Sequence, residues 1–70
     1  MLIKLTATKA VNLANVDCID IEANVIRFGL AAQSTVIKHS CASAQNAQLA
    51  LGYIFDCAEN GYAAVDISNY

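Results

Sequence analysis

The 70-residue sequence contains no proline and no tryptophan, and only 14% of its residues are charged. Hydrophobic residues make up 57% of the chain, which is a large share for a short domain, because short chains leave much of their surface exposed. Domains of this size are commonly stabilised by disulfides, a metal or a partner chain. We therefore expect an apolar surface area that a homodimer would bury, and no proline blocks pairing between exposed strand edges.

Clusters of positive charge are also missing. Lys4, Lys9, Arg27 and Lys38 are scattered along the chain, and the net charge is −2. Binding to nucleic acid phosphates requires several clustered basic side chains, and so does polybasic attachment to a membrane. No apolar run approaches the roughly 20 residues of a membrane-spanning helix. The sequence thus argues against a nucleic acid partner and against a membrane.

The three cysteines, Cys18, Cys41 and Cys57, show no CxxC spacing. A secreted disulfide framework usually has an even number of cysteines. The first residues show no apolar stretch behind a basic flank, which a secretory signal would have. We therefore predict a cytoplasmic protein with reduced thiols.

One segment, residues 43–60, has a helical period. Its polar residues gather on one side, and its apolar residues share the opposite face, as in a helix that lies on a core. Ser43 or Ser40 is suited to cap the first turn, and Gly61 to close the last turn in a left-handed conformation. The apolar face comprises Ala47, Ala50, Leu51, Ile54, Cys57 and Ala58.

The rest of the chain alternates between apolar and polar residues, which is typical of half-buried strands. The sequence predicts one α+β domain over residues 1–70: an antiparallel sheet of four to five short strands, the helix on one face, and a short C-terminal strand. This last strand pairs at a sheet edge or with a second copy, and residues 68–70 are expected to fray. The expected strands are residues 2–7, 16–23, 25–30, 35–40 and 62–68, with residues 10–13 a return strand or a bend.

Cys41 and His39 are the residues best suited to chemistry, and the alternative function is a small-ligand-binding pocket or a thiol-dependent site built around them. A thiol near a helix N-terminus has a lowered pKa, and a neighbouring histidine could act as its base. With Cys18, the pair could also bind zinc, although a structural zinc normally has four ligands. The alternative is a surface histidine and a packed cysteine, and we expect no metal site.

Three acids lie close together in the sequence: Asp17, Asp20 and Glu22. On an exposed sheet face they could present negative charge to a basic partner, as in an acidic inhibitor protein. The alternative is a solvated face, with Arg27 on the next strand opposite Asp20 or Glu22.

Several large apolar residues lie outside the helical stripe. They either cover the margin of the core or form a contact surface for another chain. We predict a small non-catalytic accessory protein that self-associates, forms a homodimer and binds another protein. No cofactor motif is present, so we expect no cofactor. The predicted interface residues are Leu49, Tyr53 and Phe55 on the helix flanks, and Tyr62, Val65 and Ile67 near the final strand.

In size and layout, the opening strand, the isoleucine-rich hairpin and the following helix resemble many short bacterial and phage-borne reading frames. The resemblance involves no motif of a named family, so it implies no function and no site residues.

Overall fold

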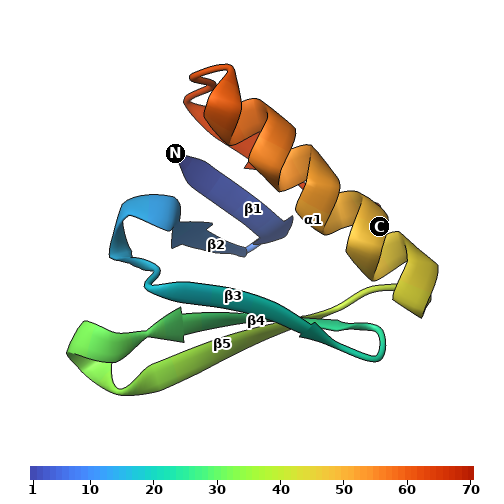
Figure 1. Cartoon of the computed structure of the whole chain (residues 1–70), viewed down its shortest axis with the longest axis horizontal. Coiled ribbons are helices and arrows are strands. Elements are labelled where there is room, and N and C mark those ends of the chain that lie inside the picture. The colour runs from blue at the N-terminus through green and yellow to red at the C-terminus, as the bar shows by residue number, and fades with distance from the viewer.

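The computed structural model describes all 70 residues and contains six strands and one α-helix (Figure 1). Short 3₁₀ turns at Leu13–Asn15 and Ala31–Gln33 join neighbouring strands. The α+β class, the helix and the short C-terminal strand are as predicted. The elements are β1 (Leu2–Thr6), β2 (Lys9–Asn12), β3 (Cys18–Glu22), β4 (Val25–Leu30), β5 (Thr35–Ser40), α1 (Ala44–Glu59) and β6 (Ala64–Asp66).

The strands form two three-stranded sheets, in the orders β2-β1-β6 and β3-β4-β5. The prediction of one antiparallel sheet of four to five strands was therefore wrong. β6 pairs with β1 in parallel, with Val65 opposite Ile3. Parallel pairing requires a long crossover connection, and the chain from β2 through α1 provides it. The first sheet is consequently mixed.

The second sheet is an antiparallel meander with two distinct faces. Asp20 lies opposite Arg27, which lies opposite Lys38 on β5. These residues point outward, whereas Ile26 and Phe28 of β4 are buried. The tight turn between β3 and β4 has its positive φ at Ala23 (54°).

Helix α1 has the predicted caps. The Ser43 side chain accepts a hydrogen bond from the Asn46 N–H, which satisfies one free donor of the first turn. At the other end Gly61 has φ +73° and its N–H bonds to the Ala58 carbonyl, while the Tyr62 N–H bonds to the Cys57 carbonyl. This pair of bonds is the Schellman motif. No helix of the structure has the length and apolar character needed to cross a bilayer.

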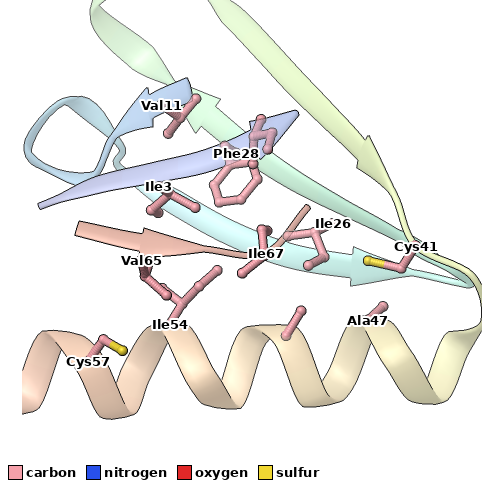
Figure 2. Packing of buried hydrophobic residues seen from close by; sticks show 12 residues of the cluster. Ile3, Val11, Ile26, Phe28, Cys41, Ala47, Ile54, Cys57, Val65 and Ile67 are labelled. Carbon is pink, nitrogen blue, oxygen red and sulfur yellow. The ribbon is translucent and has the colours of Figure 1, made fainter. Parts of the chain in front are cut away.

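The core lies between the two sheets and α1 (Figure 2). Ala47 and Ile54 point from α1 toward the strands (Figure 2), and small residues on this face let the helix lie close to β3, β4 and β6. Of the predicted stripe, Leu51 is half-buried and Ala58 is exposed. The core cluster comprises Ile3, Leu5, Val11, Ile26, Phe28, Cys41, Ala47, Ala50, Ile54, Cys57, Val65 and Ile67.

The last residues are held by hydrogen bonds, contrary to the expectation that they fray. The main-chain oxygen of Tyr70 accepts bonds from the Ala42 N–H at 2.9 Å and from Asn46 Nδ2 at 2.9 Å. The Tyr70 N–H bonds to Ile67. This segment therefore runs back to the beginning of α1.

Candidate functional site

Cys41 is a core residue rather than an exposed thiol at a helix end. Its side chain is buried, and burial raises the pKa of the Cys41 thiol. The first turn of α1 starts three residues later and is capped by Ser43, so Cys41 does not have the lowered pKa expected from its position in the sequence. Its main chain links two elements: the Cys41 N–H donates to the Asn24 carbonyl, and Asn24 Nδ2 donates to the Cys41 carbonyl, both at 2.8 Å.

His39 is buried on the inner face of the second sheet, opposite Ile26. The alternative of a surface histidine is therefore wrong. The ring atom Nε2 is sealed from solvent and has no hydrogen-bond partner. No hydrogen bond joins the imidazole to the Cys41 thiol, so the base and nucleophile of a thiol enzyme are not paired here.

Cys18 does not join His39 and Cys41. It is exposed and lies on the outer face of β3, whereas His39 points to the inner face of the same sheet. No group of three or more His, Cys, Asp or Glu side chains is close enough together to hold a metal ion.

The three acids make contacts within the molecule. Arg27 donates two bonds to Asp20, Nε to Oδ1 and Nη2 to Oδ2, each 2.7 Å long. Its Nη1 lies 3.1 Å from Glu22 Oε2. Asp17 accepts the Ala31 N–H at 2.8 Å. The hydrogen bonds from Arg27 lower the pKa of Asp20, and the same pair raises the pKa of Arg27.

The predicted interface residues divide into two groups. Val65 is buried and Ile67 is fully buried in the core, so neither offers its side chain to a partner. Leu49, Phe55 and Tyr62 are at least half exposed, and Tyr53 is 40% exposed. The accessible members of the predicted interface thus lie on α1 and in the residues that follow it.

On α1, the exposed apolar residues occupy two flanks. Leu49 and Tyr53 share one flank, where the Tyr53 ring lies 6.0 Å from the Tyr70 ring. The nearby Cys57 thiol, followed by partial burial, raises the pKa of Tyr53, and Tyr70 and Tyr62 contribute further. Phe55 lies on the other flank of the helix.

Gly52 lies between the two flanks, at the centre of the solvent-facing side of α1. A Cβ atom built on it would meet no other atom within 4 Å. The sequence places Gly52 on the polar side of the helix, but a lone glycine in the middle of a helix was a signal in itself, because glycine is unfavourable there.

Comparison of the chain with family models, with curated proteins and with solved structures found no match.

Proposed function

We propose that the chain is a non-catalytic accessory protein that self-associates through the outer side of α1. One observation carries the proposal. Six large apolar side chains are substantially exposed, and four of them, Leu49, Tyr53, Phe55 and Tyr62, lie on α1 or directly after it. The other two, Leu2 and Val36, belong to different sheets.

The composition of this side supports a protein interface. The centres of such interfaces are enriched in aromatic residues and poor in charge. The Tyr53 ring lies 6.0 Å from the Tyr70 ring, and an aromatic side chain that already packs on a neighbour loses little conformational entropy on binding. Figure 1 shows α1 at the edge of the molecule, with the strands on one side only, so its outer side is open to a partner.

The test is the solution mass by light scattering across a dilution series in reducing buffer. We expect a dimer at high concentration that the double variant Leu49→Ser/Phe55→Ser abolishes. The matched control is Leu2→Ser/Val36→Ser, which removes two apolar residues of similar exposure from the sheets and should leave the dimer intact. A monomer at every concentration, or a dimer equally sensitive to both variants, would contradict the proposal.

A further inference from the structure

Gly52 lies in the middle of α1, on its solvent-facing side. In the middle of a helix, glycine is less favourable than any residue except proline. Nothing in this molecule approaches the place where its side chain would be, so the fold of the single chain does not require a glycine. A missing side chain on an open helix face is useful where another backbone comes close.

The residues around Gly52 form a symmetric pattern. Helical neighbours on one face lie three, four and seven positions apart. Three positions before and after Gly52 are Leu49 and Phe55, both apolar. Four and seven positions away, a glutamine on the N-terminal side matches an acid on the C-terminal side. These matched residues are Gln48 with Asp56 and Gln45 with Glu59, and all six residues of the pattern are exposed.

We propose that two copies of the chain pack their α1 helices antiparallel across a two-fold axis at Gly52. In such a pair, a residue n positions before Gly52 faces the residue n positions after it in the partner, because an isologous interface is self-complementary. Leu49 then meets the partner copy's phenylalanine, and the glutamine amides of one helix can donate to the carboxylates of the other. This inference rests on the proposed function and names the partner and the geometry.

Charge favours the antiparallel over the parallel arrangement. α1 has no acid in its first turn and no base in its last, while Asp56 and Glu59 lie close to its C-terminal end. Acids are unfavourable there, because the C-terminal end of a helix dipole is negative. In the antiparallel pair they lie over the positive half of the partner helix. In a parallel pair, acids would face acids.

The size of the contact indicates a reversible dimer. A 16-residue helix is about 24 Å long and about 10 Å across. Its outer face is small beside the roughly 800 Å² per partner of a standard interface. We therefore expect dissociation on dilution rather than a permanent assembly.

Cross-linking tests the geometry directly. Gln48→Cys and Asp56→Cys are made separately in a Cys18→Ser background, which removes the only exposed native thiol. One of the two proteins carries an isotope label, they are mixed, and a mild oxidant is added. In the antiparallel pair, positions 48 and 56 face each other, whereas two copies of position 48 lie about 12 Å apart along the axis, beyond disulfide reach. We expect the mixed disulfide and little of either like pair.

A large side chain at position 52, on the proposed two-fold axis, gives a second test. Gly52→Leu should fill the space that the partner helix needs and weaken the dimer by about ten-fold or more, while the melting temperature of the dilute monomer does not fall. The control Ala32→Leu adds bulk at an exposed residue of the Ala31–Gln33 turn. This turn lies away from α1 (Figure 1), so the variant should leave the dissociation constant of the dimer unchanged.

The outcomes separate this inference from the proposed function. Like-pair disulfides at position 48, or a dimer unaffected by Gly52→Leu, would overturn the antiparallel pair while self-association stands. A monomer at every concentration would overturn both.

Discussion

His39 is the one polar residue in an otherwise apolar interior. Its Nε2 has lost water and gained no partner, and a buried polar group in this state costs about 1–3 kcal/mol. No hydrogen bond to Nε2 explains why a histidine, rather than an aliphatic residue, stands at this position. The imidazole is therefore expected to weaken the fold.

Replacing this residue tests that conclusion. We expect His39→Leu to leave the free energy of unfolding unchanged or to raise it by about 1 kcal/mol, because it removes the unpaired nitrogen and keeps most of the volume. Urea denaturation measures the change. The control His39→Ala should lower stability, because it leaves a cavity. A loss of more than about 1 kcal/mol with leucine would mean that the imidazole makes a stabilising contact.

The backbone conformation of Ser34 lowers the stability of the fold for a different reason. It has φ 51° and ψ 40°, the left-handed conformation, and its N–H bonds to the Ala31 carbonyl. Ser34→Gly should raise the free energy of unfolding by about 0.5–1 kcal/mol, because the relief of steric cost exceeds the added freedom of the unfolded chain. The control Ala32→Gly, at a residue without positive φ, should lower it. Thermal melts of both variants give the comparison, and equal effects of the same sign would refute the argument.

Among the elements, the β3–β4 hairpin is joined across its outer face by Arg27, which contacts Asp20 and Glu22. The pKa of Asp20 is lowered by these bonds. A carboxylate with a lowered folded pKa stabilises the fold above its unfolded pKa, and this contribution disappears as the pH falls through the folded pKa. The pair is open to water, so its effect is small.

The stability that Arg27 gives to the hairpin should depend on pH. Arg27→Met should be less stable than the parent at pH 7, and the difference should shrink as the pH falls below the ordinary range of aspartate, near 3.8. Denaturant unfolding at pH 7 and pH 3 measures it. Lys9→Met is the control, because Lys9 has no ion pair. Its stability difference from the parent should not shrink in this way between pH 7 and pH 3. A difference for Arg27→Met that is equally large at both pH values would show that packing, rather than charge, joins the strands.

Helix α1 could be predicted from sequence because its signals are local. Ser43 and Gly61 mark its ends, and the small-residue stripe marks its buried face. The exposure of Leu49 and Phe55 follows from the same period. Gly52 is missing from the predicted interface, because the helical period places it on the polar side of the helix, where no contact is expected.

Sheet pairing could not be predicted in the same way. The alternation around Val65 identifies a strand, yet its partner β1 lies at the far end of the chain, and no local signal specifies that contact. Alternation also shows which residues share a face without showing which face is covered. For this reason the sequence predicts Val65 and Ile67 as interface residues although they lie in the core, and it offers a surface position as an alternative for His39, which is buried.

The whole molecule has one core to which both sheets and the helix contribute. Its accessible surface of 4317 Å² is close to the about 4,200 Å² expected for a folded monomer of this mass. The single chain is thus already compact. Cys41 reaches this core from the segment after β5, and Cys57 reaches it from the last turns of α1, so the two buried thiols report on different parts of one packed unit.

Thiol labelling tests whether that unit opens as a whole. We expect Cys18 to react at once with a thiol reagent, because it is exposed, and Cys41 and Cys57 to react slowly and with the same protection, because both become accessible only on global unfolding. Mass spectrometry of timed samples, with each site identified by peptide mapping, gives the three rates. A Cys18→Ser variant should leave the two slow rates unchanged. Faster labelling of Cys57 would show that α1 detaches while the sheets persist, whereas fast labelling of Cys41 would show that its thiol is reachable without unfolding, as a reactive site built on Cys41 and His39 requires.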